Sequence, residues 1–233
     1  MSNQIDLSVI ILTYNESLHI KRCINSVKKY VREVIVVDSY STDKTLNICK
    51  KLKVRIYKNK FINQAIQMNW VLKNINIKSK WIFRIDADEF IEKDSLNNIG
   101  NIIKSNKNIS GIIIKRKVKF FNKIINYGLT SPHKTLRIWK KGKGKYPILD
   151  VDEQAKVTGK VFLSSSTIID HNLKSFKWWI NKHKNYSKRE AISYLKSKQF
   201  AWRYAYIKNN FFKNNNKFNN ISRIKILHAP TSP

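Results

Sequence analysis

Acidic residues are scarce in this sequence. Of 233 residues, 15 are Asp or Glu and 46 are Lys or Arg, so the formal net charge is +31. Residues 1–100 contain 17 basic and 10 acidic side chains, a net charge of +7, whereas residues 101–233 contain 29 and 5, a net charge of +24. Abundant Lys, Asn and Ile explain most of the total as compositional bias, but not the difference between the halves. Such a field attracts polyanions, namely nucleic acid, anionic lipid or a phosphorylated glycan, and indicates no reaction.

Cysteine, glycine and long apolar runs are scarce as well. The two cysteines, Cys23 and Cys49, lack the spacing of metal ligands, which predicts ordinary reduced thiols. No G-x-G-x-x-G follows the first predicted strand and no G-x-x-x-x-G-K-S/T occurs, so dinucleotide-binding and Walker-type phosphate loops are disfavoured. No apolar run approaches the roughly 20 residues of a membrane-spanning helix, and no signal peptide is visible. These features predict a cytoplasmic protein.

The hydrophobic content of 42% is sufficient for a globular core. In the first half, apolar segments typical of buried strands alternate with segments of helical spacing. The predicted strands are 7–13, 34–37, 54–57 and 81–85, and the predicted helices are 16–30 with Asn15 as N-cap, 42–51 capped by Thr42 or Asp43, and 63–76. Strands that are apolar on both faces and separated by helices predict a mostly parallel sheet in an α/β fold.

The second half has a different pattern, with strands followed by one long helix. Strands are predicted at 111–121, 135–142 and 166–173, a strand or loop at 145–157, and a helix over 175–212. From residue 214 the sequence is polar and rich in Asn, which predicts a poorly ordered tail. We therefore expect four parts of the chain: an α/β half (1–110), a region of strands and loops (111–173), a helical segment (174–213) and a tail (214–233).

Polar residues follow three of the predicted strands at the point where each strand ends. They are Thr13, Tyr14, Asn15, Asp38, Ser39, Asp86 and Asp88. Any one of them alone is typical of a turn or a helix cap. In an open parallel sheet, however, all three strand ends lie at the carboxyl edge, where such folds bind ligands. We therefore expect these residues to meet at one site.

Three carboxylates, Asp86, Asp88 and Glu89, occur within four residues after the strand at 81–85. Carboxylates hold Mg²⁺ or Mn²⁺, hard ions that share oxygen ligands with substrate phosphates. The cluster therefore predicts a metal that neutralises a diphosphate. The alternative is that Asp88 and Glu89 begin a helix, where acidic side chains favour the N-terminus, and the D-x-D pattern alone favours that alternative.

Four segments together resemble a known family. SVIILTYNE (8–16), VIVVDSYSTDKT (34–45), FRIDADE (83–89) and KNYSKREA (184–191) resemble the family 2 inverting glycosyltransferases of GT-A fold. They are most similar to the bacterial subgroup that adds sugars to lipopolysaccharide core or other surface glycans. The resemblance spans roughly residues 7–195 and implies a GT-A type nucleotide-sugar-binding fold, with a mostly parallel sheet flanked by helices and a C-terminal basic aromatic helical segment.

The resemblance implies a set of residues for the nucleotide-sugar donor. Asp38 would accept the imino N–H of a uracil-like base, and Asp88 would ligate Mn²⁺ or Mg²⁺. The metal would neutralise the departing nucleoside diphosphate. The implied nucleotide-binding residues are Thr13, Tyr14, Asn15, Asp38, Ser39, Gln67, Asp86 and Arg137, and the implied metal ligands are Asp88, Asp86 and His171.

Inversion by single displacement also needs a general base for the acceptor hydroxyl. The subgroup usually has His-Glu at the corresponding place, and this chain has Asp152 and Glu153. Glu153 is the predicted base, since a carboxylate serves when its surroundings raise its pKa, and Asp152 leaves the choice open. Asn185 and Tyr186 are expected on the acceptor side.

The chain departs from the family at two further places. Met68 stands where relatives usually have Arg after Gln, so that Gln67 or Asn69 would replace its contact. The segment 202–213 resembles the start of the family's membrane-facing region, but an Asn-rich sequence follows it. Residues 176–213 mix aromatic with basic side chains, which suits a helix on the anionic inner membrane surface. The same composition is typical of single-stranded nucleic-acid binding.

The leading hypothesis is a metal-dependent inverting glycosyltransferase. It would use a UDP-sugar and a lipid-linked or oligosaccharide acceptor for lipopolysaccharide or surface polysaccharide synthesis, as a peripheral protein on the cytoplasmic face of the membrane. A polyprenyl-phosphate glycosyltransferase, which takes a phosphate as nucleophile, is the nearest alternative. A basic nucleic-acid-binding protein on the same scaffold and a member that has lost activity are the others. No specific nucleic acid is expected, because no nucleic-acid motif is present.

Overall fold

The computed structural model describes residues 4–128, 131–147 and 154–196. The chain forms two compact units, Met1–Trp179 and Ile180–Pro233, and each is described by itself. All strands described below belong to the first unit. The described part of the second unit is the continuation of one helix, α5 (Phe176–Lys196), which begins in the first unit.

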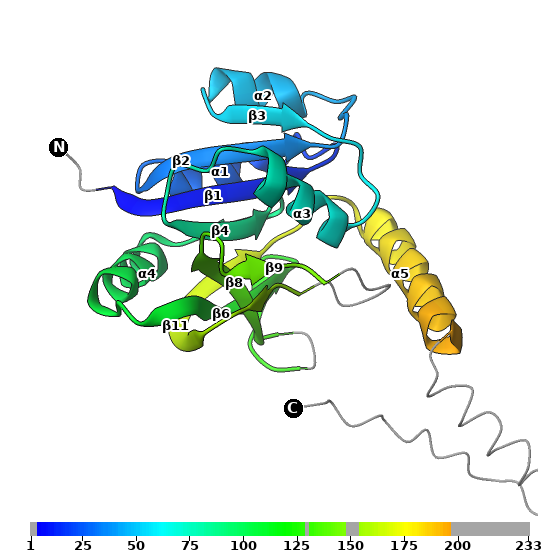
Figure 1. Ribbon diagram of the computed structural model, residues 1–233. Coiled ribbons are helices and arrows are strands. Elements are labelled where there is room, and N and C mark those ends of the chain that lie inside the picture. Colours follow the sequence, from blue (N-terminus) through cyan, green and yellow to red (C-terminus); the bar gives the residue numbers. More distant parts are fainter. Residues whose placement is uncertain (1–3, 129–130, 148–153, 197–233) are drawn as a thin grey trace, which may run out of the picture. The chain divides into compact units, whose positions relative to one another are not determined.

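The described residues of the first unit form a large mixed sheet (Figure 1). Its strands and those of a small hairpin are β1 (Ile5–Thr13), β2 (Val31–Asp38), β3 (Arg55–Lys58), β4 (Trp81–Asp86), β5 (Glu89–Ile91), β6 (Ile109–Phe120), β7 (Lys123–Ile125), β8 (His133–Lys140), β9 (Gly144–Lys145), β10 (Lys156–Val157) and β11 (Lys160–Asp170). The order is β3-β2-β1-β4-β8-β6-β11-β5, with β7 beside β6, and β9 pairs with β10 separately.

Most strands of the large sheet run in one direction. Strands β3, β2, β1 and β4 are parallel neighbours, as are β6 and β11, whereas β8, β7 and β5 are antiparallel to theirs. The helices before α5 are α1 (Ile20–Val27), α2 (Thr45–Lys51), α3 (Gln64–Asn74) and α4 (Lys93–Ser105). The predicted α/β fold with a mostly parallel sheet is confirmed.

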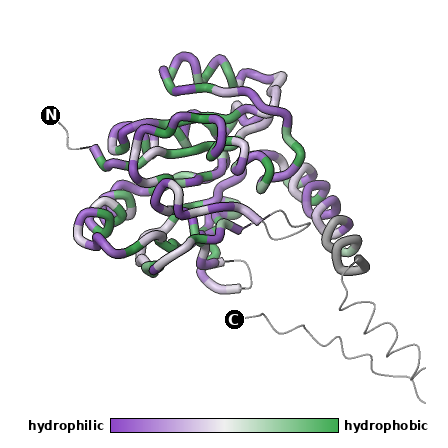
Figure 2. Tube along the Cα trace, in the orientation of Figure 1, coloured by the Kyte–Doolittle hydropathy of each residue, from purple (hydrophilic) through white to green (hydrophobic). Residues whose placement is uncertain are grey.

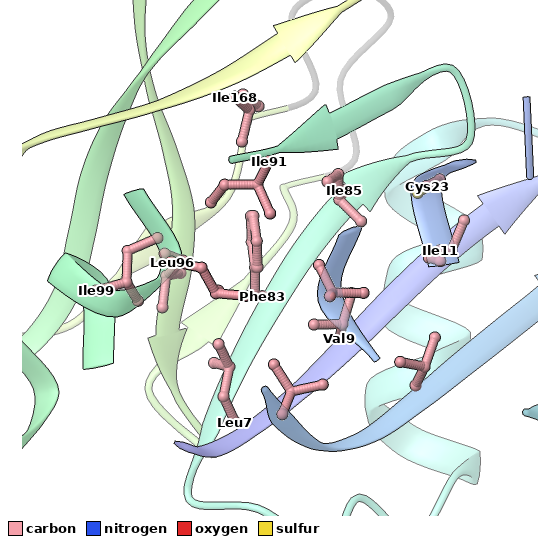
Figure 3. Packing of buried hydrophobic residues seen from close by; sticks show 14 of the residues in the cluster. Leu7, Val9, Ile11, Cys23, Phe83, Ile85, Ile91, Leu96, Ile99 and Ile168 are labelled. Atoms are coloured by element: carbon pink, nitrogen blue, oxygen red, sulfur yellow. The ribbon is translucent and has the colours of Figure 1, made fainter. Parts of the chain in front are cut away.

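Two apolar layers hold the helices against the sheet. In one layer, Leu7, Val9 and Ile11 of β1 pack with Phe83 and Ile85 of β4, and α1, α2 and α4 contribute to the same cluster (Figure 3). In the other layer, α3 packs against the opposite side chains of the same strands. Strand β1 is covered on both faces, which explains its nearly continuous apolar sequence. Figure 2 shows this concentration of apolar residues along the central strands.

The register of the parallel strands brings the predicted polar residues to one edge. Thr13 of β1 lies opposite Asp38 of β2, and Leu12 lies opposite Asp86 of β4. Because neighbouring parallel strands end together, residues far apart in the sequence become neighbours. The sequence-based expectation for this edge is confirmed for Thr13, Asp38 and Asp86.

Three local expectations are not met, one of them the alternative of a helix start at Asp88 and Glu89. Helix α2 begins at Thr45 with Lys44 as its N-cap residue, so neither Thr42 nor Asp43 is its cap. Asn15 does not cap a helix, because α1 begins at Ile20 and its N-cap residue is His19. Residues Glu89–Ile91 do not begin a helix either, because they form β5, which pairs with β11. Helix α4 begins only at Lys93. Pairing with a strand far along the chain outweighed the local preference of acidic residues for a helix start.

Both cysteines are free and buried, in agreement with the prediction of ordinary thiols. Burial raises the pKa of the Cys23 thiol well above its usual value, and burial also raises that of Cys49, to about 11. Thiols in this state are poor nucleophiles. No helix among the described residues is long and apolar enough to cross a membrane.

Candidate active site

The loop after β2 is fixed by its own polar side chains and by Asn15. The carboxylate of Asp38, fully buried, accepts hydrogen bonds from the backbone N–H of Ser41 at 2.8 Å and from its hydroxyl at 2.5 Å. Asn15 has a φ of 52°, in the left-handed region that Asn tolerates, and its side chain accepts from the backbone N–H of Thr42 at 2.8 Å. Asn15 therefore joins the loops that follow β1 and β2.

Asp43 makes a second connection between the same loops. Its carboxylate accepts from the backbone N–H of Thr45 at 2.9 Å, from the Thr45 hydroxyl at 2.5 Å and from the backbone N–H of Ser17 at 3.1 Å. Partial burial raises the pKa of Asp43, but the hydrogen bonds from Thr45 and Ser17 outweigh it and lower the pKa to about 2. The charged form is thus the one that holds the loops together.

This pKa predicts an acid-dependent loss of stability. Asp43→Ala is expected to lower the free energy of unfolding at neutral pH by about 1–3 kcal/mol, the range for hydrogen bonds to a charged group. Because the folded pKa lies below the unfolded value of about 3.9, the contribution is complete above that value and is lost as the pH falls toward 2. Urea unfolding of both proteins between pH 6 and pH 2 measures it. A stability difference that stays constant over that range would contradict the prediction.

The remaining residues predicted for the nucleotide differ in their surroundings. Gln67 is buried, accepts from the Asn59 amide at 2.7 Å, and donates to the Ser39 hydroxyl at 3.3 Å. The Thr13 hydroxyl is buried and has no hydrogen-bond partner among the described residues. Tyr14 is 56% exposed. Gln67 therefore supports the loop of Ser39, whereas Thr13 and Tyr14 retain the capacity to contact a ligand.

Met68, which stands where relatives usually have Arg, is a core residue. Met68 is fully buried and packs in the apolar layer of α3. Asn69, the other residue considered as a replacement, exchanges hydrogen bonds with the backbone N–H and carbonyl of Tyr146 at 3.1 and 2.7 Å. An arginine would be difficult to accommodate in the surroundings of Met68, because an unpaired buried charge is costly.

A network of charges joins strands β4, β5, β6, β8 and β11. Asp86 pairs with Arg84 at 2.5 Å and with Arg137 at 3.3 Å. Arg137 also pairs with Glu89 at 2.8 Å, and Arg116 lies 3.2 Å from Glu89. The backbone N–H of Asp86 donates to Glu89 at 2.8 Å, and Arg116 pairs with Asp170 at the far end of the network. Each carboxylate of the network is thus paired with at least one arginine.

The network shifts the pKa of its members in different directions. Burial raises the pKa of Asp86, but the charges of Arg84, Arg137 and Arg116 together outweigh it and hold the pKa well below its usual value, so this carboxylate stays charged. Burial raises the pKa of Glu89, and Arg137 opposes this. Burial lowers the pKa of Arg137, but Glu89 and Asp86 more than reverse the effect. Arg137 is the cation that the two carboxylates share.

Arg22 of α1 fixes the segment that holds Asp88. Its guanidinium donates to the backbone carbonyls of His171 at 2.5 Å and Asp88 at 3.1 Å, and lies 2.9 Å from Nδ1 of His171. Arginine has no acceptor, so Nδ1 of His171 accepts and Nε2 carries the proton. Burial and the charge of Arg22 lower the pKa of His171. Asn172 donates from its amide to the Asp88 carboxylate at 3.1 Å.

A second contact joins the loop before α1 to the segment after β11. Nδ1 of His19, fully buried, is 2.5 Å from the Glu16 carboxylate, and its Nε2 accepts from the backbone N–H of Leu173 at 2.8 Å. Lys174 pairs with the same carboxylate at 2.7 Å. The loop after β1 and the segment after β11 are therefore bound to one another beside Asp88.

Of the three residues predicted to hold a divalent metal, Asp88 has different surroundings from Asp86 and His171. Among the described residues, no group of three His, Cys, Asp or Glu side chains forms a ready metal site. Asp86 is bound by two arginines, and His171 has the tautomer in which Nε2 is protonated. Asp88, whose carboxylate is held by a neutral amide, is the hard oxygen ligand that the arrangement favours.

The other predicted site residues are Asp152, Glu153, Asn185 and Tyr186. Asp152 and Glu153 lie outside the described residues. Asn185 and Tyr186 lie on α5 within the second unit, where the Tyr186 ring is 6.1 Å from that of His183. Their assignment to catalysis and to the acceptor stays a prediction.

Sequence reasoning missed most of the partners of the acidic residues. Arg84, Glu89 and Arg116 are network members that no motif identified as such. Arg84 and Glu89 stand in short strands whose other residues are mostly apolar, whereas Arg116 stands between two lysines of β6. A charged residue inside an apolar strand is rarely buried without a partner, and that was the available signal. Arg22 gave no such signal, because a basic residue on a helix is usually exposed.

Comparison with known proteins decides the family. The sequence model of the family described as Glycosyl transferase family 2 matches residues 8–152, which include both Asp38 and the Asp86–Asp88 segment. The chain belongs to glycosyl transferase family 2. The matched range covers every strand from β1 to β9 except the start of β1, together with α1 to α4.

Individual relatives in this family match parts of the chain. It is 38% identical to the SPbeta prophage-derived glycosyltransferase SunS of Bacillus subtilis over 100 residues, 40% of this chain and 22% of that protein. It is 26% identical to an uncharacterized glycosyltransferase of Rickettsia prowazekii over 82% of this chain and 68% of that one. It is 27% identical to the lipopolysaccharide core biosynthesis glycosyltransferase LpsC of Rhizobium meliloti over 64% and 56%.

The match to the first of these relatives thus spans about a fifth of the relative's length. Among solved structures, S. aureus TarS 1-349 is similar in fold, with a TM-score of 0.50 and 18% identity over 91% of this chain and 75% of that one. At that identity the similarity concerns the fold alone.

Proposed function

We propose that this family 2 member is an inverting glycosyltransferase that moves a sugar from a nucleotide-sugar donor, a UDP-sugar, to a lipid-linked or oligosaccharide acceptor of a bacterial surface glycan. One observation carries the proposal. Asp38 is the last residue of β2 and Asp86 is the last residue of β4, and both strands pair in parallel with β1. Asp88 follows two residues after Asp86. Carboxylates are therefore present at the sheet edge where such folds bind a nucleotide. Relatives named as glycosyltransferases, LpsC among them, support the reaction class and the pathway.

The buried carboxylate of Asp38 suits the base of the donor. Two hydrogen bonds from Ser41 already orient it, so little reorganisation is needed when a base N–H approaches. The Thr13 hydroxyl, buried and without a partner among the described residues, would gain one from the ligand. Tyr14 provides an exposed aromatic ring beside them.

The ionic residues suit the diphosphate. A divalent metal bound to Asp88 supplies Lewis-acid stabilisation of the departing nucleoside diphosphate. Arg84 and Arg137 keep Asp86 charged and in place beside it. Asn172 and Arg22 orient the Asp88 segment, from the side chain and from the backbone respectively. Such supporting contacts typically decide metal affinity by 10–100-fold.

Donor binding tests this proposal. Wild-type protein is titrated with a panel of nucleotide sugars, with and without Mn²⁺, and slow hydrolysis of the donor is measured in parallel. We expect one class of donor to bind in a metal-dependent manner, and Asp88→Asn to weaken that binding about 10–100-fold, because the amide is a poor metal ligand. Asp94→Asn, at an exposed carboxylate in the first turn of α4, is the matched control and should bind as wild type does.

Two results would overturn the proposal. One is the absence of binding to every nucleotide sugar while the protein binds nucleic acid tightly with a strong dependence on salt. The other is metal-dependent donor binding that Asp88→Asn leaves unchanged, which would move the metal away from this segment.

A further inference from the structure

The turn between β6 and β7 exposes an aromatic side chain in an unfavourable backbone conformation. Phe121 has a φ of 43° and is 74% exposed, and Asn122 beside it has a φ of 61°. Left-handed backbone suits Gly or Asn, not a bulky side chain, and water does not favour an exposed ring. Neither local effect explains a phenylalanine at this place, so an external contact is a reasonable cause.

Phe121 belongs to a cluster of rings within the first unit. Its ring centroid lies 4.5 Å from that of Phe120 and 6.0 Å from that of Phe176, in the first turn of α5. Trp179 stacks on Phe176 at 5.8 Å and lies 5.4 Å from Phe120. The rings brace one another, yet Phe176 is still 51% exposed. The cluster of rings is therefore partly exposed to solvent and is not a buried core.

Further exposed apolar side chains follow Phe121 in the sequence, in β7 and directly after it. Ile124 and Ile125 of β7 are 40% and 37% exposed, and Tyr127 is 91% exposed. They lie at the end of the β6–β7 hairpin that carries Phe121. Ile124 is opposite Lys119 and Ile125 is opposite Val118, so the two isoleucines project from opposite faces of the hairpin. Isolated exposed apolar residues need no explanation, but four of them within seven residues of one hairpin end, with Phe121 next to Phe176, mark a contact with another body.

Lysines line one face of the same hairpin, the face from which Ile124 projects. Lys115, Lys117 and Lys119 alternate along β6 and so project from the same side of the strand, and Lys134 lies directly opposite Lys115. Lys123 is exposed at the start of β7. The nearest carboxylate in register, Asp170, lies opposite Val118 and is paired with Arg116. The sequence has no Asp or Glu between Asp94 and Asp150, so this hairpin carries positive charge only.

We propose that this end of the hairpin docks the protein on an anionic lipid bilayer. The docking surface consists of Phe121, Ile124, Ile125, Tyr127 and Phe176, together with Lys115, Lys117, Lys119, Lys123 and Lys134. The apolar side chains enter the boundary between headgroups and acyl chains, and the lysines meet the anionic headgroups. The combination selects a bilayer, because a second copy would bring the same positive charges face to face, and nucleic acid would leave the isoleucines without a partner.

Binding to vesicles tests the proposal with the full chain. We measure partition onto vesicles of phosphatidylglycerol and phosphatidylcholine in equal parts, and onto phosphatidylcholine alone. Phe121→Asn places at the left-handed position a residue that tolerates it, so the fold should persist. We expect strong binding to the anionic vesicles, weak binding to the neutral ones, and a loss of about tenfold or more in Phe121→Asn. Lys117→Gln combined with Lys123→Gln should lose about tenfold and become less dependent on salt.

Phe61→Asn is the matched control. Phe61 is also an exposed phenylalanine, at 50%, but it follows β3 at the other side of the sheet, and its replacement should leave the partition unchanged. Metal-dependent donor binding should be the same in Phe121→Asn and in wild type, so failure of the docking surface is distinct from failure of the proposed function.

Three results would overturn the docking surface. Wild-type protein that does not bind anionic vesicles has no such surface. Equal binding by wild type and Phe121→Asn would show that lipid attaches through another part of the chain. A Phe121→Asn protein that loses self-association, with vesicle binding unchanged, would show that the surface joins two copies.

Discussion

Arg137→Met is expected to lower the free energy of unfolding by about 3–5 kcal/mol, the range for removing one partner from a buried ion pair. Arg137 is 5% exposed and bridges Asp86 at 3.3 Å and Glu89 at 2.8 Å. Methionine fills a similar volume, so the cavity contribution is small, and the loss reports the two carboxylates. Denaturant unfolding at neutral pH measures it.

Two further variants make this prediction specific. Arg137→Met combined with Glu89→Gln removes one of the stranded charges and should recover part of the loss, a coupling that a double-mutant cycle detects. Arg32→Met breaks an exposed pair with Asp6, whose side chains are 54% and 37% exposed, and should cost at most about 1 kcal/mol. An Arg137→Met protein as stable as Arg32→Met would show that the charges are solvated and that the network is not structural.

Glu153→Gln is expected to reduce sugar transfer about 10²–10⁴-fold while leaving donor binding intact, the result of removing a general base. Acidic residues are few in this half of the chain, and among them Asp170 is already paired with Arg116. Glutamine keeps the shape of the side chain and removes its basicity. Transfer is measured under single-turnover conditions, with donor binding measured separately.

The variants Asp152→Asn and Asp150→Asn complete this experiment. Asp150→Asn is a matched control that should retain transfer. A large loss in Asp152→Asn with full activity in Glu153→Gln would assign the base to Asp152. Full activity in both would favour a polyprenyl-phosphate acceptor, whose phosphate needs no base. Wild-type protein that binds its donor but transfers to no acceptor would identify a member of the family that has lost activity.

Local sequence was sufficient for the strands that build the site. Buried parallel strands need apolar residues on both faces. The strands predicted to begin at Leu7, Val34 and Trp81 can therefore be recognised from their apolar sequence. Where such segments stop, polar residues must follow, and parallel pairing places those residues together. The positions of Thr13, Asp38 and Asp86 at one edge follow from these two facts alone.

The partners of these residues depended on strands that are distant in the sequence. Arg137 reaches Asp86 and Glu89 because β8 inserts between β4 and β6, an arrangement that no local pattern specifies. Asn15 bonds to the loop after β2 in place of capping α1, since the register of β1 and β2 brings Thr42 to it.

The sequence by itself therefore determined the α/β class, the strand ends and the carboxylates that stand there. Only the tertiary structure decided which cations hold those carboxylates, that Met68 is a core residue, and that Phe121 joins Phe176 on an open surface. The physical reason is range. Burial and periodicity act within a few residues, whereas ion pairs and ring contacts depend on the register of strands brought together by folding.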